Sequence, residues 1–167
     1  MGNAKGGAIM DTARTVRDVL RKKGHGYWGV PPRTMVYDAL ELMAEKNIGA
    51  LLVVDRQELL GVFSERDYAR KVILKGKSSK TTTVEELMSK PPICAGLDMT
   101  IHEGMVLMSQ NQIRHLPVID NGAIVGVLSV SDVVTDIIET QEATIHQLEG
   151  YIRGDDTEIS MVGQNTR

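Results

Sequence analysis

The chain has 167 residues, of which 42% are hydrophobic and 25% charged, and this composition is typical of one compact globular domain or of two small half-domains. The net charge of -3 and the pI of about 5.8 exclude the basic surplus expected of a protein that binds nucleic acid or an anionic membrane. The single cysteine, Cys94, cannot form an internal disulfide, so we expect a reducing compartment, the cytoplasm.

Residues 1–11 are glycine-rich and lack the apolar stretch of a secretory signal. Gly6 stands where an N-terminal acylation motif has Ser or Thr. No apolar run in the chain approaches the roughly 18 residues of a membrane span. We therefore expect a flexible N-terminal tail and no membrane association.

An internal repeat organises most of the remaining chain. Shifted by 65 positions, Val36–Ile73 aligns with Ile101–Ile138 without a gap, and apolar positions match even where identity fails. The preceding segments, residues 15–20 and 83–88, also resemble each other with a small shift. A gap-free match of this length indicates two copies of one small fold.

Each copy predicts the same elements in the same order. A lead helix (about 15–23 and 84–89) is followed by a short extended piece (27–30 and 92–95), a helix (35–46 and 101–110), two strands (50–54 with 59–64, and 116–119 with 124–129) and a second helix that begins at Glu65 and Val130. Thr100 with Glu103 predicts a capping box. Asn121-Gly122 predicts a tight hairpin, because both residues accept positive φ.

We therefore predict an α+β protein of two β-α-β-β-α repeats, packed about a pseudo-two-fold axis and followed by a C-terminal helix, because a unit of this size buries little core alone. The expected boundaries are a tail at 1–11, repeats at 12–76 and 84–140 with a linker at 77–83, and a helical extension with a loose tail at 141–167.

Each hairpin ends in the same pattern, with a strand that finishes in serine and an aspartate three residues later: Ser64 with Asp67, and Ser129 with Asp132. One interpretation is a helix N-cap, in which serine and the acidic side chain satisfy backbone N–H groups. The other is a ligand site, in which the hydroxyl meets a phosphate and the aspartate holds ribose hydroxyls. The two are compatible, and recurrence in both copies favours the second.

These features together resemble a tandem pair of cystathionine-beta-synthase-type (CBS) repeats, or Bateman module. The resemblance rests on the doubled element pattern, the two G-h-h-S-x-x-D endings and the strand at 113–118, and it covers about residues 12–140. The segments 65–71 and 77–80 are similar to those of small stand-alone CBS-pair proteins. The resemblance implies a ligand such as AMP, ADP, ATP, NAD or S-adenosylmethionine, although some members bind none.

The resemblance also implies two clefts, each of which takes its aspartate from one repeat and its adenine-side strands from the other. Cleft A joins residues of the first hairpin to residues of the second repeat, namely Val62, Ser64, Arg66 and Asp67 with Ile93, Cys94, Arg114, His115 and Pro117. Cleft B joins the corresponding opposite residues, namely Val127, Ser129, Ser131 and Asp132 with Trp28, Val30, Gly49, Ala50 and Leu52.

Charge separates the two clefts. Cleft A contains Arg66, Arg114 and His115, whereas Ser131 and the pair Gly49-Ala50 stand at the equivalent positions of cleft B. Phosphate prefers cations, above all the guanidinium fork. We therefore expect the phosphate-bearing ligand, AMP first, in cleft A. Cleft B is left with a nucleoside-like group, a weaker nucleotide or nothing, and Trp28 either stacks on a base or fills space.

No pattern in the sequence indicates catalysis. The histidines are not at metal-ligand spacing, and Cys94 on a predicted strand is interpreted as a small apolar residue rather than a nucleophile. We expect a non-catalytic nucleotide sensor that acts on an unidentified effector protein. A scaffold without a ligand, an S-adenosylmethionine binder and, last, a phosphoryl-transfer enzyme are the alternatives.

The segment 133–152 predicts one long helix. Ile138, Ile145 and Ile152 are seven residues apart and Leu148 extends the stripe, as in a short coiled coil. The helix either folds back on the module or pairs with another chain. Because the resemblance implies dimers, we expect a homodimer, and we expect the polar chain beyond Gly154 to be loose.

Overall fold

The computed structural model describes residues 14–158 and the side chains of residues 14–152. The predicted tail at 1–11 therefore lies outside the described residues. The chain divides into two units, one that ends at Val130 and contains both sheets, and one that begins at Ser131 and whose described residues, up to Glu158, are helical. Among the described residues, no helix combines the length and the apolar character needed to cross a bilayer.

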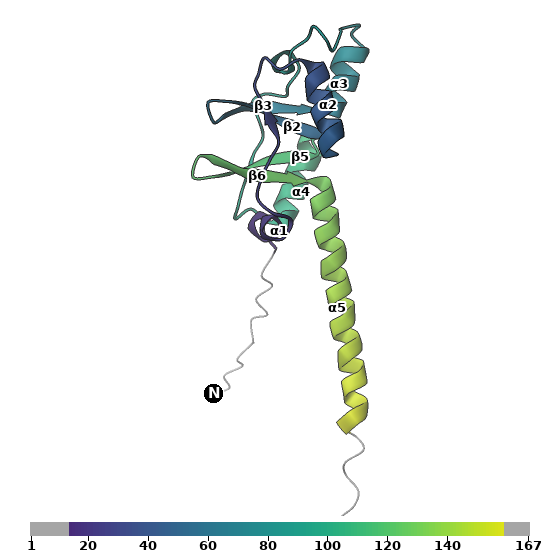
Figure 1. Cartoon of the computed structure of the whole chain (residues 1–167). Helices are drawn as coiled ribbons and strands as arrows, with labels where there is room; N and C mark the ends of the chain where they lie inside the picture. The colour runs from purple at the N-terminus through teal and green to yellow at the C-terminus, as the bar shows by residue number, and fades with distance from the viewer. Residues whose placement is uncertain (1–13, 159–167) are drawn as a thin grey trace, which may run out of the picture. The chain divides into compact units, whose positions relative to one another are not determined.

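Two three-stranded sheets repeat one topology (Figure 1). In each, a two-residue strand pairs in parallel with the first strand of a hairpin. The first sheet contains β1 (Gly29–Val30), β2 (Ala50–Asp55) and β3 (Glu58–Ser64), and the second contains β4 (Ala95–Gly96), β5 (His115–Asp120) and β6 (Ala123–Ser129). Both hairpins carry a bulge at the same place, after Val53 and after Val118. The 65-residue repeat predicted from the sequence is confirmed.

Both hairpins turn through two residues with positive φ. The predicted turn at Asn121-Gly122 has φ of 48° and 80°. The matching turn in the first copy is made by Arg56 and Gln57, with φ of 46° and 71°. Arginine and glutamine adopt this conformation less readily than asparagine and glycine, so the first turn had no sequence signal of its own.

The central helices, α2 (Val36–Lys46) and α4 (Ile101–Asn111), begin differently. The predicted capping box starts α4, since the Thr100 backbone N–H donates to Glu103 Oε2 at 2.8 Å and the Glu103 N–H donates to Thr100 Oγ1 at 3.1 Å. At the start of α2, the Val36 N–H donates instead to the carbonyl of Thr82 at 2.9 Å, which belongs to the segment leading into the second copy.

Each lead segment packs on the other repeat. Helix α1 (Val16–Lys23) contacts β6, and the Val16 N–H donates to the Met99 carbonyl at 2.9 Å (Figure 1). The second lead, expected as a helix at 84–89, is a single 3-10 turn, η2 (Val84–Glu86), and its Val84 N–H donates to the Thr34 carbonyl at 2.9 Å. The extended pieces are also shorter than predicted, because pairing partners exist for only two residues of each.

The core of the first repeat includes the second lead. Val84 and Leu87 belong to the same buried cluster as Val36 and Phe63. Gly61, on β3, allows this approach: a Cβ there would lie 2.7 Å from the Ser89 carbonyl oxygen and 2.8 Å from Met88 Sδ. Because backbone oxygen cannot move aside cheaply, only glycine fits where the second lead crosses β3.

Helical segments follow both hairpins, as predicted. After β3, the short helix α3 (Glu65–Tyr68) continues as a π-helical turn, η1 (Ala69–Ile73). After β6, α5 (Val130–Glu158) is one continuous helix of 29 residues, longer than the predicted segment 133–152 and helical past Gly154.

Candidate functional site

The Ser64–Asp67 turn at the end of β3 is a complete helix cap. The backbone N–H and the hydroxyl of Ser64 donate to Asp67 Oδ2 at 3.0 and 2.7 Å, and the Asp67 N–H donates to Ser64 Oγ at 3.3 Å. The capping interpretation of this turn is therefore confirmed. Whether the same turn can also bind a ligand depends on the partners of the second Asp67 oxygen, Oδ1.

Similar boxes occur at Thr15–Asp18 and Thr83–Glu86. Backbone N–H donation from the threonine, followed by donation from its hydroxyl, lowers the pKa of Asp18 and of Glu86 below their ordinary values. The S/T-x-x-D/E pattern alone therefore identifies helix starts, and a ligand site requires a further feature.

Asp67 differs from these caps in its second oxygen. Oδ1 lies 2.7 Å from Lys71 Nζ and accepts a long hydrogen bond of 3.4 Å from Ser89 Oγ. The Asp67 side chain is only 12% exposed, against 47% for the capping Glu86. Asp67 is thus a recessed carboxylate at the junction of β3, α3 and the second lead. One oxygen is held by the helix cap, and the other contacts Lys71 and Ser89, which a ligand could replace.

Lys71 and Ser89 were not among the predicted site residues. Lys71 lies on η1, and its Nζ also donates to the Leu87 carbonyl at 2.6 Å, so one ammonium group links the first repeat to the second lead. The i,i+4 spacing from Asp67 to Lys71 was available in the sequence as a signal. Ser89 had none, because it reaches Asp67 through the pairing of Val62 with Ser89, at 2.9 and 3.2 Å.

Arg66 brings the start of α3 to the second repeat. Its guanidinium donates to the carbonyl of Gln112, the C-cap residue of α4, at 2.6 Å. Gln112 lies two residues before Arg114, which is exposed and whose carbonyl accepts from the Val130 N–H at 3.0 Å. The structure therefore brings Arg66 to the loop that carries Arg114, and the cationic cleft A stays a prediction.

His115 is the first residue of β5 and pairs with Ser129. The imidazole is half-buried and lies against Gly49 of the first repeat, where a Cβ would be 3.6 Å from His115 Cε1 and 3.7 Å from Glu65 Oε2. His115 was assigned to cleft A and Gly49 to cleft B, so the two predicted residue sets meet here.

The remaining cleft A residues are less exposed. Pro117 is buried in β5, while Ile93 and Cys94 are half-buried and precede β4 rather than forming the strand predicted at 92–95. Burial raises the pKa of the Cys94 thiol, which lowers the thiolate fraction available to a nucleophile.

Most residues predicted for cleft B lie in the strands of the first sheet and in β6. Val30 and Leu52 are buried, and Ala50 and Val127 are half-buried in strands. Trp28 is 48% exposed, and Lys46 Nζ lies 4.7 Å from the centroid of its ring, so Trp28 does not fill the core. Ser131 and Asp132 lie in the first turn of α5, within the second unit.

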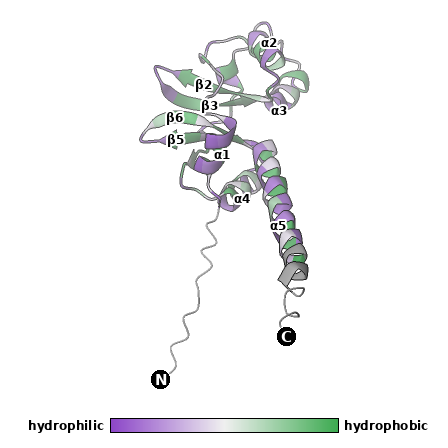
Figure 2. Cartoon of the chain, turned by 60° about the horizontal axis from the view of Figure 1, so that its bottom comes forward, coloured by the Kyte–Doolittle hydropathy of each residue, from purple (hydrophilic) through white to green (hydrophobic). Residues whose placement is uncertain are grey.

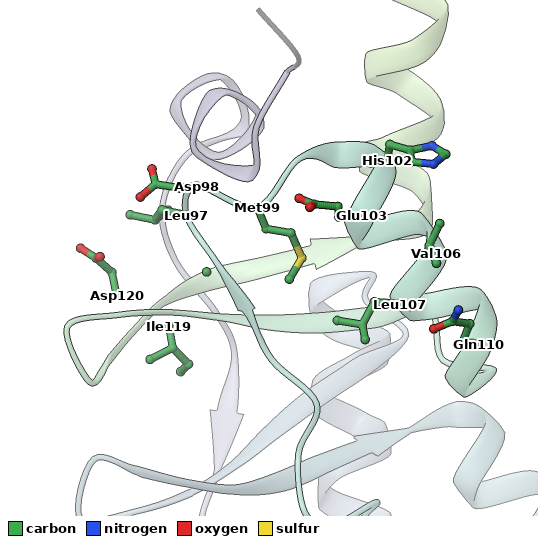
Figure 3. Close-up of a pocket in the computed structure, with 11 residues that line it drawn as sticks. Leu97, Asp98, Met99, His102, Glu103, Val106, Leu107, Gln110, Ile119 and Asp120 are labelled. Atoms are coloured by element: carbon green, nitrogen blue, oxygen red, sulfur yellow. The ribbon is translucent and has the colours of Figure 1, made fainter.

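A groove of about 630 Å³ lies elsewhere, in the second repeat between α4, β5 and the loop after β4 (Figure 3). Its charged residues are Asp98, Glu103 and Asp120, with His102 at the edge. Asp98 is paired with Arg17 at 2.7 Å, and Glu103 belongs to the capping box of α4. This acidic groove would repel a phosphate, and no predicted site residue lines it.

No group of three histidine, cysteine, aspartate or glutamate side chains within residues 14–152 is arranged to hold a metal ion.

The sequence pattern of one family, the CBS domain, matches the chain twice, at residues 16–73 and 84–139. The chain belongs to the CBS domain family.

Other CBS proteins match most of the chain. The mitochondrial CBS domain-containing protein CBSX3 of Arabidopsis thaliana is 37% identical over 150 residues, which are 84% of this chain and 72% of that protein. The structure of a putative signal-transduction protein with CBS domains from Burkholderia ambifaria superposes with a TM-score of 0.73 at 44% identity, over 76% of this chain and 96% of that one. CBSX2 in complex with AMP superposes with a TM-score of 0.63 at 27% identity, over 75% and 97% of the two chains.

Proposed function

We propose that this CBS pair binds an adenine nucleotide, AMP first, in cleft A, catalyses no reaction, and transmits occupancy to an effector protein. The observation that carries the proposal is the recessed Asp67, whose Oδ1 is held by the exchangeable groups of Lys71 and Ser89. The AMP bound by CBSX2 supports this choice of ligand.

The chemistry of the turn suits a sugar phosphate. Asp67 Oδ1 would accept a hydrogen bond from a ribose hydroxyl in place of Ser89, and the ammonium of Lys71 would then be free to meet a phosphate. Arg66, with the arginine of the 112–115 loop, supplies further cations. ADP, ATP and NAD present the same ribose and additional phosphate and are the alternatives.

Occupancy would act by linking the two repeats. The proposed contacts come from β3 and α3 of the first repeat, and from the second lead and the 112–115 loop. A ligand that bridges these segments favours the arrangement in which all of them are in reach, and it shifts the population only by its differential affinity. An effector that recognises this arrangement would then sense the nucleotide, in the reducing cytoplasm that the lone Cys94 suggests.

The test is isothermal titration calorimetry with AMP, ADP, ATP, NAD and S-adenosylmethionine, paired with thermal unfolding. A ligand at 100 times its Kd should stabilise the fold by about 2.7 kcal/mol. Asp67→Ala should abolish the binding heat. Asp18→Ala is the matched control, because it removes an equivalent capping carboxylate on α1. Asp132→Ala, in cleft B, should have the smaller effect.

Two results would contradict the proposal. If none of the five compounds shifts the unfolding temperature, the chain is a scaffold in which Ser64 and Asp67 serve only as a cap, a role that the resemblance to the Thr15–Asp18 box favours. If Asp18→Ala weakens binding as much as Asp67→Ala, the ligand lies elsewhere. Turnover of AMP or ATP by the purified chain would replace the sensor with an enzyme.

A further inference from the structure

The second unit exposes an apolar stripe. Every residue of α5 from Thr140 to Ile152 is exposed. The stretch includes large apolar side chains, with Ile145 54%, Leu148 59% and Ile152 73% exposed. Side chains of this size are rarely left in water as a continuous row, so the row marks a surface for another protein segment.

The row has the seven-residue period of a coiled coil. Ile138, Ile145 and Ile152 occupy one position of the heptad, called a, while Val134, Gln141 and Leu148 occupy position d. The outward positions b, c and f carry polar or small residues, among them Ala143, His146 and Gln147. Figure 2 shows hydrophobic (green) and hydrophilic (purple) residues interleaved along α5.

The helix needs this surface covered in order to persist. It is rich in β-branched residues and contains Gly150, all of which have low helix propensity. Stability of such a helix comes from packing of its apolar face rather than from propensity. At 29 residues it is about 43 Å long, enough for a partner helix of equal length to lie along it.

We propose that α5 pairs with α5 of a second copy of this chain as a parallel two-stranded coiled coil, with Ile138, Gln141, Ile145, Leu148 and Ile152 as its seam. Isoleucine at all three a positions of the seam, with Leu148 at d, favours two parallel strands over larger assemblies. Gln141 is the one polar residue in this seam, and amide-to-amide pairing across the axis fixes the register.

The charged residues of α5 favour a parallel over an antiparallel orientation of the two helices. Position e carries Glu142 and Glu149, whereas position g carries Ile137, Thr144 and Tyr151. In an antiparallel pair, e faces e of the partner, and the glutamates would oppose glutamates. In a parallel pair, e faces g, so each glutamate meets an uncharged side chain. The parallel arrangement avoids the repulsion.

The first experiment measures mass in solution by light scattering and sedimentation, for Ile145→Glu and for Ala143→Glu. Both add the same charge to an exposed residue of α5, one in the seam and one on the outward face. We expect Ala143→Glu to keep the mass of the native chain, at least twice 18.3 kDa, and Ile145→Glu to lose half of it. Equal masses for the two variants, or a monomeric native chain, would overturn the proposal.

The second experiment reports direction and does not depend on other contacts between copies. In a Cys94→Ser background, Leu148→Cys should form a disulfide between chains, because d faces d in a parallel register, and Ala143→Cys should not. Absence of the Leu148→Cys disulfide would reject the parallel pair. Neither experiment requires a nucleotide, so failure of cleft A leaves both results unchanged.

Discussion

The two oxygens of the Asp67 carboxylate have different partners, and this difference is the basis for proposing a ligand contact in addition to the helix cap. Oδ2 is committed to the cap of α3, while Oδ1 is held by Lys71 and, at long range, by Ser89. The Lys71 side chain is 34% exposed, so its ion pair with Asp67 is only partly shielded from water. In the proposed site, Lys71 would therefore compete with a ribose hydroxyl for Oδ1 but would attract a phosphate.

This competition predicts that Lys71→Met changes the selectivity of the site. Methionine keeps the length of the side chain and removes the charge. Adenosine should bind more tightly to this variant than to the native chain, and AMP more weakly. The preference for AMP should therefore fall by at least about tenfold, since a hydrogen bond to a charged group contributes about 1.5–3 kcal/mol and about 1.4 kcal/mol corresponds to a factor of ten. Calorimetric titrations with both compounds measure the ratio. Lys75→Met, on an exposed residue nearby, should leave it unchanged, and an unchanged ratio in Lys71→Met would mean that Lys71 does not face the ligand.

How much of the site the sequence predicts depends on the range of each contact. The cap of Ser64 and Asp67 is local and follows from three-residue spacing. The approach of Arg66 to Gln112 spans 46 residues and was anticipated only through the resemblance. Ser89 reaches Asp67 through the crossing of a lead segment over β3, and no local pattern encodes which strand a lead crosses.

At the level of elements, each hairpin carries a glycine where a lead segment crosses it. Gly61 faces Ser89 and Met88, and the equivalent Gly126 faces Leu20 of α1, where a Cβ would lie 3.1 Å from the leucine methyl groups. The obstacle at Gly61 is a backbone carbonyl, whereas at Gly126 it is the end of a flexible side chain. The two copies therefore differ in how well they tolerate a methyl group.

Gly61→Ala should accordingly destabilise the protein by about 1–3 kcal/mol, the usual range for an overpacked site. Gly126→Ala should have a smaller effect, because Leu20 can shift. Gly96→Ala, where a Cβ would meet nothing within 4 Å, serves as the control and should stay within about 0.5 kcal/mol. Urea unfolding followed by circular dichroism gives the three values. A Gly61→Ala variant as stable as Gly96→Ala would show that the second lead moves aside freely.

Over the whole chain, the short β-branched strands and the Asn121-Gly122 turn were predictable from local residue types, and the 65-residue repeat was predictable from the self-similarity of the sequence. The packing of each lead segment on the other repeat was not predictable from the sequence. The sequence places residues 12–23 with the first repeat and 84–89 with the second, yet Val16 bonds to Met99 and Val84 bonds to Thr34. Each repeat is thereby completed by a segment that precedes the other, which makes the two copies interdependent.

Two fragments of equal length test this interdependence. Residues 12–76 form the first repeat as its order in sequence suggests, but they lack Val84 and Leu87 and leave α1 without its partner strand β6. Residues 25–89 omit α1 and contain the first sheet together with the lead that completes its core. Because burying Val84 and Leu87 restores apolar contacts worth roughly 1.5–3 kcal/mol each, we expect 25–89 to give the better-dispersed amide NMR spectrum and the later urea midpoint. Equal or better order in 12–76 would mean that each repeat folds with the lead segment that precedes it. The packing of leads on the other repeat would then add nothing to the contact between repeats through which a nucleotide in cleft A would act.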